Sequence, residues 1–313
     1  MILNDRPLTL QEIKEIIFNT PDFFLAGSRE CKQTIIAPDR LKLLLWGDPQ
    51  ENEYIDIKGT RIAYTKKGNG DCIVLLHGMR DCKHVLNPLT MKLAHNYSTL
   101  GVDLRGHGYS DMNSGEYSTT LFAHDIIRLI EHLDPGKVHL IGHSLGAALV
   151  LEIALEIPEK IGKLVVMGAA IKEENVDYKP ANPEMMLKDK DPARHGKFLD
   201  MLDKKFFGLP GLDKAKAETT REKIMLTWMM HHEKNVLNLM KMKRTELADK
   251  ASQIPHPVLA IAGEFDVVGN PSQSGFLKNS LPDCRVESIK GTGHYMFLDF
   301  TDQVARHIKE FID

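Results

Sequence analysis

One pentapeptide, Gly142-His143-Ser144-Leu145-Gly146, joins two runs of opposite conformational preference. The apolar run at 138–141 favours a strand, and the run at 147–155 favours a helix. A serine on such a sharp turn takes a strained backbone conformation, so the residues two positions to either side must be very small. The helix that begins there turns its unpaired N–H groups and positive dipole end toward the serine. This context favours Ser144 as a nucleophile.

Strand and helix patterns alternate along most of the chain. Helices are expected at 119–133, 145–156 and 301–312, and a hairpin is expected at 54–57 and 61–64. Runs rich in Val, Ile and Leu predict parallel strands, covered on both faces, at 72–77, 97–102, 138–142, 163–168, 257–263 and 284–289. Such alternation predicts an α/β protein with a mostly parallel, doubly wound sheet. Catalytic groups should then gather at the carboxyl ends of the strands.

Two segments depart from this alternation. The first, at 171–252, is charged and rich in methionine, lacks strand patterns, and predicts three or four inserted helices. The second precedes the core and includes an amphipathic helix at 9–17, with Thr9 as its cap. It could pack on the core, form a dimer or cover a site. The expected parts are an N-terminal helical extension (1–50), a first core part (51–170), a helical cap (171–252) and a second core part (253–313).

Two polar motifs follow the later strands. Gly263-Glu264-Phe265-Asp266 comes after the strand at 257–262, and Gly291-Thr292-Gly293-His294 comes after the strand at 284–289. Nucleophile, acid and base then occur in the order Ser144, Asp266, His294, which differs from the order in trypsin-like and subtilisin-like enzymes. With these motifs the chain, over about 52–313, resembles the α/β-hydrolase superfamily in its cap-bearing serine esterase/lipase-like branch.

The resemblance implies a catalytic triad. Ser144 would be the nucleophile, His294 its base, and Asp266 the acid that orients the histidine. Glu264 is a nearby rival for the acid. Glu173 and Glu174 are a remote alternative, because some relatives place the acid after the strand at 163–168.

The resemblance also implies an oxyanion hole made by the backbone N–H groups of Leu145 and Met79. Gly78 would serve the turn of the loop and His77 would hold it by a hydrogen bond. Arg80 would either face the site and favour an acidic substrate or pair on the surface. The candidates for substrate binding are His77, Gly78, Arg80, His143, Trp228 and Met229.

Other polar residues are interpreted as architecture. Asp103 and Arg105 should bond to backbone and close the loop after their strand. His143 should turn away from the serine hydroxyl. The acids and histidine of the helix at 119–133 (Asp125, Glu131, His132) should form a solvated face.

The function expected is hydrolysis of carboxylic esters through an acyl-enzyme. Carbon–carbon bond hydrolases, perhydrolases, thioesterases, amidases and proline-iminopeptidase-like enzymes share this machinery and remain alternatives. A serine at 144 argues against haloalkane dehalogenases and epoxide hydrolases, which use aspartate there. A slow-turnover small-molecule receptor of the same fold and a lipase acting at a membrane surface are further alternatives.

Composition limits the partners. The formal net charge is −3 and no long basic run occurs, so nucleic acid is not expected. The beginning of the chain lacks the apolar core of a signal peptide, and no apolar run is long enough for an integral membrane segment. Four dispersed cysteines suggest free thiols and a cytoplasmic location. We expect a small-molecule ester substrate, a possible homodimer, no organic cofactor and no metal.

Overall fold

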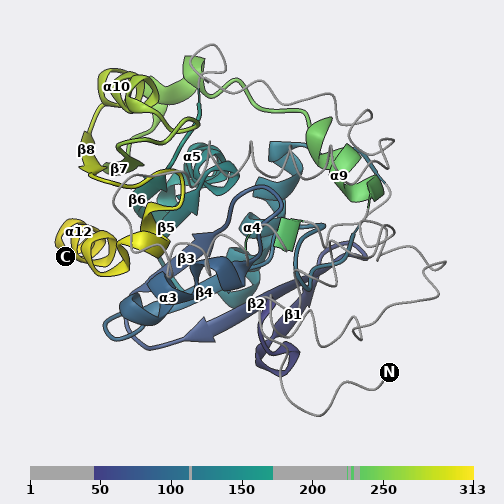
Figure 1. Cartoon of the computed structure of the whole chain (residues 1–313). Helices are drawn as coiled ribbons and strands as arrows, with labels where there is room; N and C mark the ends of the chain where they lie inside the picture. Colours follow the sequence, from purple (N-terminus) through teal and green to yellow (C-terminus); the bar gives the residue numbers. More distant parts are fainter. Residues whose placement is uncertain (1–45, 113–114, 172–223, 225–226, 229–232) are drawn as a thin grey trace, which may run out of the picture.

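The computed structural model describes residues 46–112, 115–171, 224, 227–228 and 233–313. These residues form an eight-stranded sheet with the order β1-β2-β4-β3-β5-β6-β7-β8 (Figure 1). The strands are β1 Glu53–Asp56, β2 Arg61–Lys67, β3 Cys72–Leu76, β4 Ser98–Val102, β5 Val138–His143, β6 Ile161–Met167, β7 Val258–Gly263 and β8 Cys284–Ile289. Each strand lies within a few residues of its expected position.

The sheet is mostly parallel. Strands β1 and β2 form an antiparallel hairpin, and β2 also pairs antiparallel with β4. Every other neighbouring pair, from β4 across to β8, is parallel. The two central strands, β3 and β5, are almost wholly buried. The order places the ends of β3, β5, β6, β7 and β8 side by side. The α/β-hydrolase architecture expected from the sequence is confirmed.

Helices cover both faces of the sheet (Figure 1). Alternate residues of β3 separate the two cores: Val74 and Leu76 pack with one set of helices, and Ile73 and Leu75 with the other. The first set is α4 Thr119–Leu133, α5 Leu145–Glu156 and α10 Pro271–Ser280. The second set is α3 Asn87–Leu93, α11 Met296–Asp299 and α12 Thr301–Ile312.

Shorter elements complete the described chain. They are α9 Glu233–Met240 and the 3₁₀ turns η2 Pro49–Glu51, η3 Lys83–Leu86, η4 Pro158–Lys160 and η6 Ala248–Gln253. The expected helix at 9–17 and most of the expected cap lie outside the described residues, so both stay predictions. Among the residues that are described, no helix has the length and apolar character needed to cross a membrane.

A buried ion pair fixes α4 against the loop after β4. The Arg105 guanidinium donates to both carboxylate oxygens of Asp125, at 2.7 and 2.5 Å, and also to the hydroxyl of Thr60 at 2.7 Å. The expectations for this pair were therefore wrong: Asp125 is 3% exposed rather than solvated, and Arg105 bonds to side chains rather than backbone. Asp103 does accept backbone N–H groups, from Lys83 at 2.7 Å and from Tyr109 at 3.0 Å.

The Asp125→Ala variant should be strongly destabilised. Removing the carboxylate leaves a buried guanidinium without its counter-charge, which costs about 3–5 kcal/mol. Asp111→Ala is the matched control, because its pair with Arg61 is largely in water and should matter much less. Urea unfolding of both variants measures the difference. Equal losses of unfolding free energy would contradict the assigned role of the buried pair.

Candidate active site

Ser144 occupies a sharp turn between β5 and α5, with the left-handed backbone angle φ +51°. Its N–H donates to the carbonyl of Met167, at the end of β6, over 2.9 Å. The turn leaves no room for side chains on either side. A Cβ on Gly142 would lie 2.2 Å from the carbonyl oxygen of Gly146, and a Cβ on Gly146 would lie 2.2 Å from that of Leu76. Both glycines are thus required by close approach.

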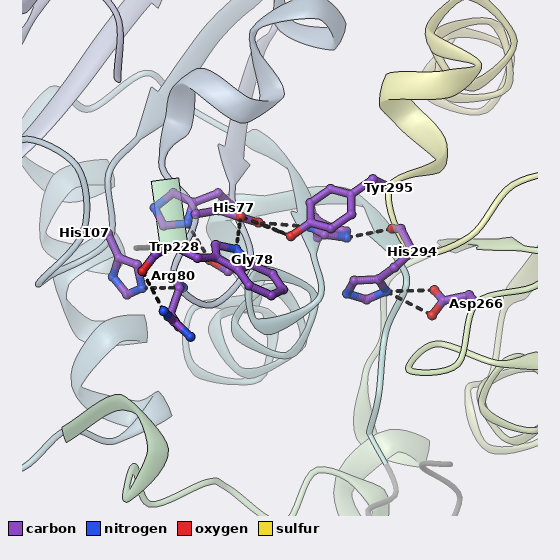
Figure 2. Close-up of polar contacts among 10 residues, drawn as sticks. His77, Gly78, Arg80, His107, Trp228, Asp266, His294 and Tyr295 are labelled. Atoms are coloured by element: carbon purple, nitrogen blue, oxygen red, sulfur yellow. Dashed lines mark hydrogen bonds and ion pairs between the residues drawn. The ribbon is translucent and has the colours of Figure 1, made fainter. Parts of the chain in front are cut away.

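Asp266 and His294 face each other beyond the ends of β7 and β8 (Figure 2). The His294 Nδ1 lies 3.0 and 2.9 Å from the two carboxylate oxygens, and both residues are only 3% exposed. The backbone N–H groups of Val268 and Gly269 also donate to Asp266, at 2.7 and 3.0 Å. Because an ionised carboxylate only accepts, Nδ1 carries the proton and Nε2 has the lone pair that a general base needs.

The loop of His294 is joined to the serine turn through His143. The two histidine rings have centroids 4.6 Å apart, and the Nε2 of His143 lies 2.9 Å from the carbonyl oxygen of His294. Gly168, just after β6, allows this assembly, because a Cβ there would lie 2.9 Å from the Nδ1 of His294 and 3.0 Å from a carboxylate oxygen of Asp266. The fold therefore brings Ser144, Asp266 and His294 together at the carboxyl ends of the strands.

The rival acid lies elsewhere. The Glu264 carboxylate is exposed and accepts the backbone N–H of Gly291 at 2.9 Å. It supports the loop before His294, whereas Asp266 bonds the imidazole itself. Glu173 and Glu174 lie outside the described residues.

The loop after β3, residues 77–81, lies against the serine turn. It is called the oxyanion loop because it carries Met79, one of the two expected oxyanion donors. A Cβ on Gly78 would lie 3.3 Å from the Cβ of Ser144. This glycine is thus needed for close approach. It also begins the turn of the loop with an ordinary φ, since its carbonyl accepts the N–H of Asp81 at 3.2 Å. In the described part of the chain neither proposed donor, the N–H of Met79 or of Leu145, bonds to another backbone group. Both N–H groups therefore stay candidates for the predicted oxyanion hole.

Two neutral histidines hold the oxyanion loop in place. The ring of His77 donates from Nδ1 to the carbonyl of Gly78 at 2.7 Å and accepts the N–H of Leu104 at Nε2, at 3.0 Å. Complete burial lowers the pKa of His77 to about 4 and keeps the ring neutral. His107 bonds the carbonyl of Arg105 at 2.8 Å and accepts the N–H of Arg80 at 3.0 Å. His77 thus holds the loop as expected.

In the described part of the chain, Arg80 contacts Trp228. Its guanidinium donates to the backbone carbonyl of Trp228 at 2.6 Å and lies over that ring, 5.6 Å from the centroid (Figure 2). The indole Nε1 of Trp228 in turn donates to Asp81 at 2.8 Å. Two chain segments that are far apart in sequence are joined at this point, and neither contact was foreseen.

The remaining candidates for substrate binding differ in accessibility. The rings of His77 and His143 are completely buried, so neither presents a surface to a ligand in this structure. Arg80 and Trp228 are half-buried, and Met229 lies outside the described residues. Sequence reasoning also missed Asp81 and Tyr295, which carry no motif of their own and are recognisable only from their contacts.

Gly146→Ala should destabilise the fold. The added methyl group would overlap the carbonyl oxygen at the end of β3, and such overpacking costs about 1–3 kcal/mol or more. Gly275→Ala on α10 is the matched control: the position has open space where the new Cβ would lie, so the variant should gain about 0.5–1 kcal/mol in helix stability. Chemical unfolding measures both changes. An unaltered unfolding free energy for Gly146→Ala would contradict the packing described.

Known proteins share both sequence and fold with this chain. The chain is 26% identical over 256 residues to a pimeloyl-[acyl-carrier protein] methyl ester esterase of Nitrosospira multiformis, covering 78% of this chain and 95% of the relative. The solved structure of an esterase from Rhodococcus sp. ECU1013 has a TM-score of 0.73 at 20% identity, covering 84% and 98% of the two chains. A meta-cleavage product hydrolase of Pseudomonas fluorescens IP01 has a TM-score of 0.64 at 20% identity, covering 84% and 98%.

The family model described as alpha/beta hydrolase fold matches residues 71–301. That match contains the serine turn, the oxyanion loop and the Asp266–His294 pair. The strand order of the sheet and the solved structures of relatives agree with this family. The chain belongs to the α/β-hydrolase family, among relatives that include esterases.

Proposed function

We propose that the chain is a serine hydrolase that cleaves carboxylic esters through a triad of Ser144, His294 and Asp266. The hydrogen-bonded pair of Asp266 and His294, joined through His143 to the strained serine turn, is the observation that carries this proposal. The esterase names of several relatives support the substrate class.

In the first half of the reaction, the Oγ of Ser144 attacks the carbonyl carbon of the ester and His294 takes the serine proton at Nε2. The C=O electron pair moves onto oxygen, and the N–H groups of Met79 and Leu145 stabilise that charge. The intermediate then collapses, the C–O bond to the alcohol breaks, and His294 returns its proton to the leaving oxygen. Asp266 stabilises the transient imidazolium.

In the second half, His294 removes a proton from water, and the hydroxide adds to the acyl carbon of the Ser144 ester. A second oxyanion forms in the same place and collapses. The proton on His294 passes to the Oγ of Ser144, which releases the carboxylic acid and restores the resting site. None of these steps needs a cofactor.

Asp266→Asn should lower kcat by about 10⁴-fold, because an amide can donate to Nδ1 and favour the wrong imidazole tautomer. Glu264→Gln is the matched control and should keep wild-type turnover, since its side chain bonds only the backbone of the loop before His294. Steady-state kinetics with one good ester measure both. A loss of the same size in Glu264→Gln, with Asp266→Asn active, would reverse the assignment of the acid.

Hydrolysis of p-nitrophenyl esters from acetate to dodecanoate tests the function itself. Fast turnover by the wild type and almost none by Ser144→Ala is the expected result. The chain length with the highest kcat/KM gives the size of the acyl pocket. Substantial turnover by Ser144→Ala would contradict the proposed nucleophile.

Covalent labelling and an interface assay, added to this experiment, separate the alternatives. Covalent labelling of Ser144 by a fluorophosphonate without turnover of any ester would favour a carbon–carbon hydrolase or an amidase. Folded protein that shows neither labelling nor turnover would favour a receptor of this fold. Activity that rises only when the ester forms an interface would favour a lipase.

A further inference from the structure

Asp81, the last residue of the oxyanion loop, is completely buried and joins three chain segments. Its Oδ1 accepts the indole N–H of Trp228 at 2.8 Å. Its two oxygens lie 3.1 and 3.2 Å from the donating hydroxyl of Tyr295. Trp228 belongs to the insertion between β6 and β7, and Tyr295 directly follows His294 (Figure 2). One carboxylate thus connects the insertion, the oxyanion loop and the loop that carries the base.

The other oxygen of Asp81 faces His143. The Nδ1 of His143 lies 3.8 Å from the Oδ2 of Asp81 and has no hydrogen-bond partner among the described residues. The Nε2 of the same ring lies 2.9 Å from the carbonyl of His294, to which it can only donate. In the neutral ring, Nδ1 therefore carries no proton and can only accept a hydrogen bond. Two acceptors face each other while the carboxylate is ionised, and a proton on Oδ2 would turn this contact into a hydrogen bond.

Burial, rather than the charged neighbours, favours a proton on this carboxylate near neutrality. Burial raises the pKa of Asp81 to about 6, against the opposing effects of Trp228, Tyr295, His294 and Arg80. The titratable or charged groups that face it are its chain neighbours Arg80 and Cys82, His143 at the end of β5, and His294 and Tyr295 after β8. His143 and Tyr295 are both neutral there, because burial lowers the pKa of His143 and raises that of Tyr295.

We propose that ionised Asp81 is a positioning residue for the acyl-transfer reaction proposed above, on which this inference rests. By accepting from Trp228 and Tyr295 together, the carboxylate holds the oxyanion loop at a fixed distance from the His294 loop. Protonation at Oδ2 draws the side chain toward His143 and weakens both bonds. The backbone donor at Met79 and the base then lose their mutual alignment.

The rate of Ser144 labelling by a fluorophosphonate measures this alignment without knowledge of the substrate. The Oγ–P bond forms, the P–F bond breaks, fluoride leaves, and the serine proton passes to His294. The probe needs the nucleophile, the base and the oxyanion donors. Asp81→Asn, a neutral side chain of the same shape, should label about 10- to 100-fold more slowly at pH 8, as expected for a misplacement near 1 Å. Tyr295→Phe and Trp228→Phe each remove one donor to Asp81 and should show smaller losses.

Steady-state kinetics provide a second measurement. The loss in Asp81→Asn should fall on kcat rather than on KM, because alignment acts on the reacting groups. Should Asp81→Asn fail to fold, the two single-bond variants decide. Wild-type labelling rates in both Tyr295→Phe and Trp228→Phe would overturn the proposal, as would a wild-type rate in folded Asp81→Asn.

The fluorescence of Trp228 supplies a readout that does not depend on catalysis. The chain has two tryptophans, so Trp46→Phe leaves Trp228 as the only tryptophan, and its emission is the one followed. Its emission should titrate with a midpoint near pH 6, as protonation of Asp81 changes the indole hydrogen bond. The step should vanish in Trp46→Phe/Asp81→Asn. It should persist in Trp46→Phe/Asp299→Asn, the matched control, where burial also raises the carboxyl pKa but the bond is to Thr292.

The two readouts keep this inference separate from the proposed function. Absence of wild-type labelling contradicts the serine-hydrolase proposal; the emission step then decides whether Asp81 controls the position of Trp228. Normal wild-type labelling with an unchanged rate in Asp81→Asn overturns the positioning role alone. An emission step that persists in Trp46→Phe/Asp81→Asn overturns the inference that protonation of Asp81 changes the surroundings of Trp228.

Discussion

The contact between the start of α5 and the end of β3 determines the geometry of the whole site. Gly146 approaches the carbonyl oxygen of Leu76 so closely that a methyl group would overlap it. This contact brings the first turn of the helix beneath the oxyanion loop and leaves Ser144 strained at the edge of the sheet. Strain of this kind persists only where the surrounding structure enforces it. Here the parallel pairing of β3 with β5 enforces it from one side and the Ser144–Met167 hydrogen bond from the other.

Much of the fold is predictable from local sequence. Parallel strands covered on both faces must be apolar along their full length, so runs such as Cys72–Leu76 stand out from the polar segments around them. Helix α4 begins at a serine cap and ends at Asp134 in a left-handed conformation, and α5 begins at the serine turn. Because these signals are local, the expected start of both helices and the expected end of α4 agree with the structure. The triad candidates were recognisable because each lies in a short motif after a strand.

The contacts that the sequence does not predict depend on distant partners. Asp125 shows the spacing of a solvated helix face, yet it is buried because Arg105, 20 residues earlier, meets it through the fold. Trp228 and Asp81 are separated by 147 positions. No periodicity within either segment encodes such a pairing. The need for glycine at 78 is similar, since it arises from the neighbouring side chains of Asp81, His143 and Ser144 rather than from its own backbone angle.

The bonding of His77 has a consequence for acid tolerance. Its Nε2 must stay unprotonated to accept from Leu104, and the buried ring titrates at about 4 instead of its usual 6.5. The unfolded chain therefore binds a proton at this residue before the folded chain does. Its contribution to stability is complete above pH 6.5 and declines as the pH falls toward 4, by up to about 1.4 kcal/mol per pH unit. The histidine that makes the loop rigid at neutral pH thus couples unfolding to proton uptake in acid.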